Sequence, residues 1–281
     1  MAQFTNRAQL TYNNIVTMSN LAVGEIQDVL SINKTAVRET YTAQDRITFA
    51  INIINSGNTD LSGLTLTDDL GLYNAGTLTL QPLSYIDGTL KYFRNNVLQP
   101  SPTVTLTKNG ISVTNFTVPA GGTATFLYES ATNEFSPLQQ GGMITNTAEL
   151  TSSFTSVSAS ATISASREPE LSIMKSISPV PVVENGTVTY TFIIQNTGNT
   201  PADIGAVITD VFDPILSNIS VTFNDIQWTA GIDYTYDTTT GLFTSAPNKV
   251  TVAAAEYVQD PVTGSIEVIP GTSTLIISGI I

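Results

Sequence analysis

The chain has 281 residues, enough for two domains that each bury a core of their own. Its 23 acidic and 10 basic residues give a net charge of -13, which disfavours nucleic acid and anionic membranes as partners, because both require clustered lysine and arginine. The sequence has no cysteine and no histidine, which excludes disulfides, thiolate and histidine metal sites and Ser-His-Asp catalysis. We expect no cofactor and no metal site, since no calcium-loop pattern is present either.

Long stretches of the chain alternate threonine or serine with valine, isoleucine, leucine or phenylalanine. Alternation with a period of two residues is typical of strands that bury one face. Proline and glycine lie between these stretches, where they indicate turns. No long stretch has the period of a helix, and none is apolar enough to span a membrane. The sequence therefore predicts an all-β fold without a membrane span.

Residues 1–24 are predicted to form a β-hairpin. One alternating run covers residues 4–11, an Asn13-Asn14 turn follows, and a second run covers residues 15–23. The start of the chain lacks the basic and apolar parts of a secretory signal. We therefore expect either the mature form of an exported chain or a chain released without a leader.

Residues 28–166 are predicted to form a complete β-sandwich, closed by a hairpin whose first strand, residues 144–151, aligns residue for residue with residues 4–11. Residues 169–281 repeat the same pattern, beginning with a second Leu-Ser-Ile-x-Lys motif. This copy reaches residue 281 without a closing hairpin. Each copy has roughly the length of a known two-sheet sandwich domain, about 100 residues or somewhat more. We therefore expect two tandem sandwiches, of which the second is incomplete.

A sandwich without its last two strands has an open sheet edge, and such edges pair with strands of other chains. The N-terminal hairpin of another copy has the matching sequence, so we expect it to fill the gap by strand complementation. Head-to-tail contacts of this kind need not close and then yield a fibre. Two alternatives stay open: the hairpin fills the gap in its own chain, or it remains a free tail.

Three polar residues recur on strand faces that are otherwise apolar and should point inward. They are Lys34, Asp68 and Asn146 in the first copy, and Lys175, Asp210 and the hairpin residue Asn6 at the corresponding positions of the second. Leaving such groups buried and unpaired would be costly. The pattern therefore indicates that the three groups interact.

A lysine amine can attack an asparagine carboxamide and expel ammonia, which leaves an amide crosslink. Burial lowers the pKa of the lysine and raises that of an aspartic acid, which then moves the protons. We expect one bond within the chain, Lys34 to Asn146, and one between chains, Lys175 to Asn6, with Asp68 and Asp210 as the proton shuttles. The alternative is a buried ion pair with an asparagine hydrogen bond, or a lysine that reaches solvent at a strand end.

Several of these motifs resemble the domain-of-unknown-function-11 repeat of bacterial and archaeal surface proteins. The resemblance covers nearly the whole chain and rests on the Lys after Leu-Ser-Ile, residues 186–192, Asn196-Thr-Gly-Asn, Thr209-Asp210 and the Thr-Asn-x-Ala of the hairpin. The first copy departs from it in one turn, where Asp45 replaces Gly186. The resemblance implies Ig-like sandwiches, a structural role and Lys-Asn isopeptide bonds. More narrowly, the chain is similar to the subunits of bacterial spore appendages, which implies an extracellular or spore-surface location.

We therefore expect a self-assembling fibre subunit whose main partner is a second copy of itself, with a terminal anchor protein as a further candidate. An adhesin or carbohydrate-binding module is the alternative, with candidate aromatic residues Tyr85, Tyr92, Phe93, Trp228, Tyr234 and Tyr236, although such residues more often pair across strands. A hydrolase with paired carboxylates is a third class, with candidates Asp68-Asp69 and Asp233 with Asp237, although aspartates in turns usually accept backbone hydrogen bonds. We expect no enzyme activity apart from self-crosslinking.

Overall fold

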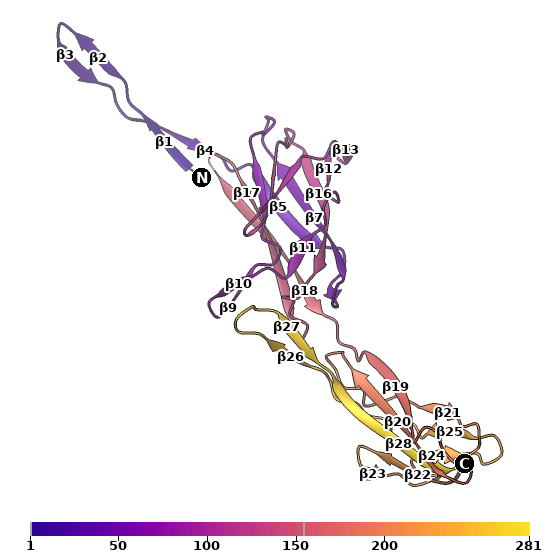
Figure 1. Ribbon diagram of the computed structural model, residues 1–281. Helices are drawn as coiled ribbons and strands as arrows, with labels where there is room; N and C mark the ends of the chain where they lie inside the picture. The colour runs from indigo at the N-terminus through magenta and orange to yellow at the C-terminus, as the bar shows by residue number, and fades with distance from the viewer. Residues whose placement is uncertain (1, 154) are drawn as a thin grey trace. The chain divides into compact units, whose positions relative to one another are not determined.

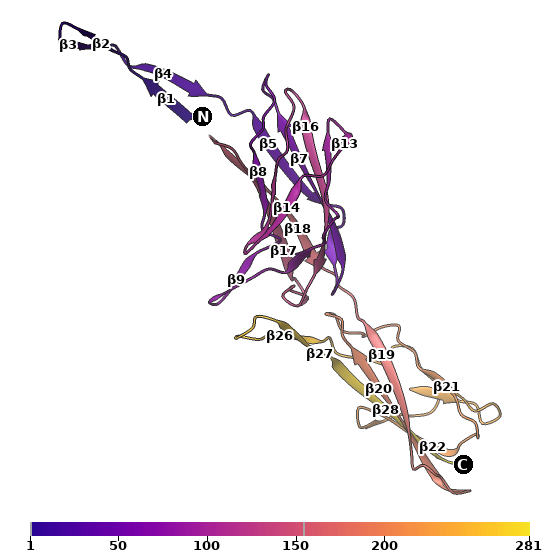
Figure 2. The same cartoon turned by 45° about the horizontal axis from the view of Figure 1, so that its top comes forward.

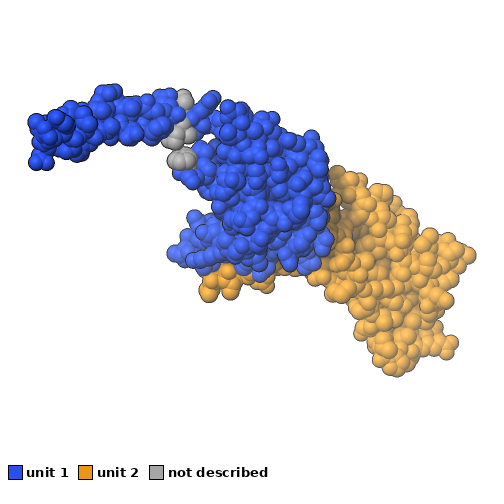
Figure 3. All heavy atoms as spheres, turned by 90° about the horizontal axis from the view of Figure 1, so that it is seen from above, with its two compact units in different colours: residues 1–137, 143–164 blue, residues 138–142, 165–281 orange. Residues whose placement is uncertain are grey.

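The computed structural model describes residues 2–153 and 155–281, and its regular elements are strands (Figure 1). The all-β prediction is confirmed. Among the described residues, no helix is long and apolar enough to cross a membrane. The chain divides into two compact units, residues 1–137 with 143–164 and residues 138–142 with 165–281 (Figure 3). Residues 138–142 thus lie in the second unit, although they fall within the range predicted for the first sandwich.

The first unit contains two antiparallel sheets of six strands each. One sheet has the order β13-β12-β16-β7-β5, with β11 also paired to β16; its strands are β5 (Leu30–Ala36), β7 (Arg46–Asn55), β11 (Leu83–Tyr85), β12 (Lys91–Arg94), β13 (Val97–Gln99) and β16 (Thr123–Thr132). The other has the order β14-β15-β8-β17-β18-β6; its strands are β6 (Thr40–Tyr41), β8 (Thr65–Asp68), β14 (Thr103–Thr107), β15 (Gly110–Thr114), β17 (Met143–Thr151) and β18 (Ser156–Ala165). A small separate hairpin pairs β9 (Tyr73–Ala75) with β10 (Leu78–Leu80).

The core of the first unit follows from the alternation of its long strands. In β16, every second side chain is buried and the others are partly exposed. Phe126 of this strand stacks on Tyr92 and meets Phe116 edge to face, with ring centroids 5.0 and 4.9 Å apart. Each fully buried aromatic side chain stabilises the fold by about 1.5–3 kcal/mol. The core therefore holds the strands that carry the candidate site in fixed positions.

Gly110 is expected to be sensitive to substitution, because its φ of +126° disfavours other residues and a Cβ there would lie 1.9 Å from the Asp68 carbonyl oxygen. We expect Gly110→Ala to lower the free energy of unfolding by about 3 kcal/mol or more. Gly121→Ala is the matched control, because Gly121 also has positive φ but open space around its Cβ position. Gly121→Ala should lower the free energy of unfolding by only about 1 kcal/mol. Urea unfolding followed by circular dichroism measures both, and equal losses would contradict the close approach.

The second unit has the same sheet order in its larger sheet but fewer strands in its smaller one. The larger sheet, β19-β20-β28-β22-β23, contains β19 (Leu171–Ser178), β20 (Thr187–Asn196), β22 (Ser217–Phe223), β23 (Ile226–Gln227) and β28 (Gly271–Ile280). The smaller sheet, β21-β25-β24, contains β21 (Thr209–Val211), β24 (Tyr234–Tyr236) and β25 (Leu242–Ser245). A further hairpin pairs β26 (Glu256–Gln259) with β27 (Ile266–Ile269).

The N-terminal hairpin is a long two-stranded ribbon (Figure 2). Strand β1 (Ala2–Asn6) pairs with β4 (Ala22–Ile26), and β2 (Gln9–Tyr12) pairs with β3 (Ile15–Met18). The register shifts by one residue between the two pairs, where Ala8 exchanges hydrogen bonds with Ser19. The ribbon ends at Ile26, two residues beyond the predicted boundary. Its turn residues, Asn13 and Asn14, have the positive φ that a tight hairpin turn requires.

Candidate crosslinking site

Four polar side chains meet in the core of the first unit, each from a different strand. Lys34 comes from β5, Asp68 from the end of β8, Tyr128 from β16 and Asn146 from β17. All four are buried. Their strands place them there because each residue occupies an inward position of an alternating strand. The structure thus brings together the three residues predicted from the sequence and adds a tyrosine.

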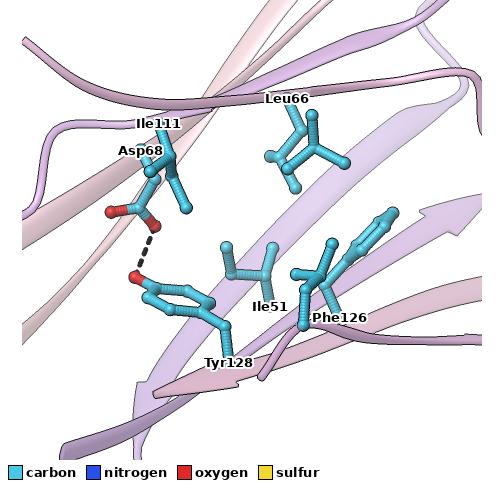
Figure 4. Close-up of a pocket in the computed structure, with 8 residues that line it drawn as sticks. Ile51, Leu66, Asp68, Ile111, Phe126 and Tyr128 are labelled. Atoms are coloured by element: carbon cyan, nitrogen blue, oxygen red, sulfur yellow. Dashed lines mark hydrogen bonds between the residues drawn. The ribbon is translucent and has the colours of Figure 1, made fainter. Parts of the chain in front are cut away.

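The four side chains form one chain of hydrogen bonds. Lys34 Nζ and the Tyr128 hydroxyl both donate to Asp68 Oδ2, each at 2.7 Å; the tyrosine bond is drawn in Figure 4. Asn146 Nδ2 donates to the Tyr128 hydroxyl oxygen at 2.8 Å. Among the described residues, Asn146 Oδ1 has no hydrogen-bond partner although it is buried. Most buried polar side-chain atoms in native structures have a hydrogen-bond partner, so this oxygen is unusual.

Burial changes the acid-base properties of this site. The side chains of Lys34 and Asp68 are 0% and 2% exposed. Desolvation lowers the pKa of Lys34, and this effect outweighs the attraction of Asp68 for the charged ammonium. Desolvation also raises the pKa of Tyr128 well above its usual value, and the nearby Asp68 charge adds to the increase. The lysine is therefore shifted toward the neutral amine, which is the nucleophilic form.

A small cavity adjoins this network. It is lined by Asp68 and Tyr128 and otherwise by apolar side chains, namely Ile51, Leu66, Leu90, Ile111, Val113 and Phe126 (Figure 4). Its volume of about 10 Å³ is the space that one water-sized molecule requires. Ammonia is of similar size, so a single ammonia molecule would fit in this cavity beside Asp68 and Tyr128.

The second unit has a corresponding ion pair in a more open setting. Lys175 Nζ lies 2.5 Å from Asp210 Oδ2, and the two side chains are 39% and 18% exposed. Three aromatic rings, those of Tyr190, Phe192 and Phe212, lie with their centroids 4.7, 5.4 and 5.2 Å from this ammonium. Such rings favour the position of a cation over their faces. The remaining predicted partner, Asn6, lies on β1 of the first unit and is exposed.

The two lysine-bearing strands differ in burial although they match in sequence. In the first unit β17 packs across β5, and Leu30 is 8% exposed. In the second unit every residue of β19 is exposed, and Leu171, which corresponds to Leu30, is 43% exposed. Strand β8 pairs with both β15 and β17, whereas β21 pairs with β25 alone among the described strands. The second unit therefore has an open core and a free strand edge where the first has β17 and β18.

Sequence comparison of the two copies does not identify Tyr128. Its inward position on β16 follows from the alternation, but the second copy has an isoleucine there. In the first unit Tyr128 lies opposite Phe49 of the neighbouring strand. Phe49 corresponds to Tyr190 in the second unit, and the residue opposite Tyr190 is Ile277. The only signal for Tyr128 in the sequence is a hydroxyl-bearing side chain among the apolar inward residues of β16.

The residues considered for other functions have structural contacts. Trp228, Tyr234 and Tyr92 are at most 7% exposed, so these three are not available for the ligand platform considered as the alternative. Asp69 accepts hydrogen bonds from two backbone amides, and Asp237 does the same. Asp233 accepts one backbone hydrogen bond and pairs with Lys249 at 2.8 Å. These aspartates therefore hold turns and loops in place.

Comparison with known proteins found no matching family model and no matching curated protein. Among solved structures, the chain is similar to the Bacillus cereus major pilin BcpA, with 10% identity, a TM-score of 0.37 and coverage of 96% of this chain and 73% of that one. The pilus backbone RrgB of Streptococcus pneumoniae matches with 11% identity, a TM-score of 0.35 and coverage of 86% of this chain and 55% of that one. The collagen-binding subdomain of the Enterococcus faecalis surface protein ACE matches with 6% identity, a TM-score of 0.32 and coverage of 50% and 99%. These scores are low and carry no argument about function, and the resemblance to the domain-of-unknown-function-11 repeat remains a prediction.

Proposed function

We propose that this chain is the subunit of an extracellular or spore-surface fibre, in which the N-terminal hairpin of one chain completes the second sandwich of the next. The observation that carries this proposal is the difference in burial between β5 and β19. Both strands begin with the Leu-Ser-Ile-x-Lys motif, but β5 is covered in the first unit and β19 is exposed in the second. The missing cover is a hairpin like the one that contains β17, and residues 4–11 of β1 and β2 match the sequence pattern of residues 144–151.

The hairpin exposes apolar side chains of the kind that would cover the open core of the second unit. In β17, the inward row of Ile144, Asn146, Ala148 and Leu150 is at most 1% exposed. The corresponding Phe4 and Leu10 are 56% and 68% exposed. Burying each of these two side chains would stabilise the contact by about 1.5–3 kcal/mol. Exposed apolar rows of this kind mark surfaces that bind a partner.

The register of the first unit specifies how the hairpin should dock. Ala148 of β17 lies opposite Asp68 of β8. The equivalent pair at the junction is Ala8 of one chain opposite Asp210 of the next. Asn6 would then stand two residues further along the same face, as Asn146 does from Ala148. This position would bring its carboxamide toward the Lys175-Asp210 pair.

Electron microscopy of the purified chain tests assembly. We expect unbranched fibres with a repeat of one chain, because donor and acceptor lie on different units and the contact is head to tail. Size-exclusion chromatography should show material far larger than a single chain. A protein that remains monomeric at all concentrations, with no fibres in the images, would contradict the proposal.

The first sandwich is proposed to close with an amide between Lys34 and Asn146, with Asp68 moving the protons. The folded chain should then weigh less than its sequence by the mass of one ammonia. Asp68→Ala should restore the full mass, because it removes the base that the ammonium contacts. Intact-mass spectrometry of denatured single chains measures this, and Lys175→Ala is the control that should keep the loss. An uncrosslinked wild-type chain would leave Lys34 and Asp68 as a buried ion pair.

A further inference from the structure

We propose that Tyr128 is a further catalytic residue of the first sandwich, and that its hydroxyl passes a proton from Asp68 to the Asn146 nitrogen as this nitrogen leaves. The inference rests on the amide proposed above. It assigns to Tyr128 a step that the sequence pattern assigns to Asp68 alone.

The contacts of Asn146 support this role. Its Nδ2 donates to the Tyr128 hydroxyl, and that hydroxyl donates to Asp68. Among the described contacts, no hydrogen bond joins Asp68 directly to Asn146, so the tyrosine is the bridge between the base and the leaving group. The Tyr128 side chain is 1% exposed, so this bridge is shielded from bulk solvent.

The reaction balances with these groups alone. The Lys34 ammonium first gives a proton to Asp68, which leaves a neutral amine and a neutral carboxylic acid. The amine lone pair then forms a bond to Cγ of Asn146, and the electrons of the C=O bond move to Oδ1. The new centre carries a positive charge on the lysine nitrogen and a negative charge on Oδ1.

The tyrosine acts when this tetrahedral centre forms. A planar amide nitrogen does not accept hydrogen bonds, but the nitrogen of a tetrahedral centre has a free lone pair, so the bond between Nδ2 and the hydroxyl can reverse. Asp68 gives its proton to the Tyr128 oxygen while Tyr128 gives its own to Nδ2. Asp68 then takes a proton from the lysine nitrogen, Oδ1 reforms the carbonyl, and the Cγ–Nδ2 bond breaks to release ammonia. The product is a neutral amide beside a protonated Asp68.

The second unit offers an internal comparison, because Ile277 occupies the corresponding position and has no hydroxyl. Tyr128→Phe should therefore slow the bond within the chain and leave the bond between chains unchanged. The phenylalanine ring should keep the packing of the Tyr128 ring against Phe49 and Tyr85. The centroids of these two rings lie 5.6 and 6.1 Å from that of Tyr128. Tyr85→Phe is the matched control, since this ring adjoins Tyr128 and should not affect the rate.

The rate of ammonia loss tests the relay. Full-length chains recovered unfolded from inclusion bodies are diluted into folding buffer, quenched at intervals and weighed by mass spectrometry. We expect Tyr128→Phe to lose ammonia about 100-fold more slowly than wild type, the usual effect of removing an acid-base group. An unchanged rate in this variant, beside normal crosslinking of the wild type, would overturn the relay alone. A wild-type chain that never loses ammonia would overturn the amide and the relay together.

A second variant separates proton transfer from packing and covers the case in which Tyr128→Phe does not fold. Placing 3-fluorotyrosine at position 128 keeps the ring and the hydroxyl but makes the hydroxyl more acidic. A relay predicts a changed rate and a shifted pH profile of ammonia loss. A purely structural role predicts wild-type kinetics at every pH, and that result would refute the proposal.

Discussion

Fibres of the wild-type chain are expected to survive boiling in detergent as a ladder of covalent oligomers, whereas Lys175→Ala fibres should separate into single chains. Docking of the hairpin would bury the Lys175-Asp210 pair as β17 buries Lys34 and Asp68. Only then would the amine be desolvated and held against the Asn6 carboxamide. Release of a chain would afterwards require breaking an amide, while a non-covalent junction yields to strong denaturant.

The variants at this junction separate assembly from crosslinking. Lys175→Ala and Asn6→Ala should both still form fibres, since strand pairing and core burial remain. Lys249→Ala is the control, because this lysine also pairs with an aspartate of the second unit but lies outside the junction. It should keep the ladder on a denaturing gel. A ladder that persists in Asn6→Ala, or wild-type fibres that dissolve fully, would refute the covalent junction and leave hairpin donation standing.

Deletion of residues 1–26 is expected to abolish fibres while the first sandwich stays folded, because the described side chains of β2 and β3 are all exposed and contribute little to its core. A peptide of residues 2–26 should stop the growth of wild-type fibres by occupying the open second unit. Electron microscopy and light scattering measure both effects. Normal fibres from the deleted chain would show that the hairpin is not the donor.

A single substitution on each face of the hairpin gives a sharper version of this test. Phe4→Asp places a charge on the row that should enter the partner's core, where an unpaired charge costs several kcal/mol. Thr5→Asp changes the neighbouring residue, which should face outward as Thr145 does in β17. We expect the first variant to remain monomeric and the second to polymerise. Equal behaviour of the two variants would contradict the proposed docking face.

The inward faces of the strands can be predicted from sequence because alternation alone fixes them. Alternation therefore places Lys34, Asp68 and Asn146 on inward faces, and their recurrence in both copies indicates that they interact. Tyr128 cannot be found in the same way, since only positions shared by both copies stand out in the sequence and the second copy has Ile277. Comparison of the two copies therefore identifies three residues of the site but not Tyr128.

Other features depend on contacts that a strand pattern does not contain. The register shift in the hairpin rests on the hydrogen bonds between Ala8 and Ser19, and the alternation of the sequence does not indicate it. Burial of Trp228 depends on its stacking against Phe223, with ring centroids 5.1 Å apart. Tyr234 is buried by stacking on Phe243. The strands and their faces are therefore predictable from alternation, whereas the aromatic contacts that bury Trp228 and Tyr234 are not.

The position of Lys34 on β5, the first strand of its sandwich, has a mechanical consequence if both amides form. Tension along a fibre would enter a chain at Asn6, follow the backbone to Lys34 and cross directly to Asn146. It would then follow the backbone to Lys175 and pass to the next chain. Residues 35–145 and 176–281 would lie outside this load path, so the hydrogen bonds within each of these segments would be shielded from the tension. The extension of the fibre under force would depend only on two short backbone stretches in each chain.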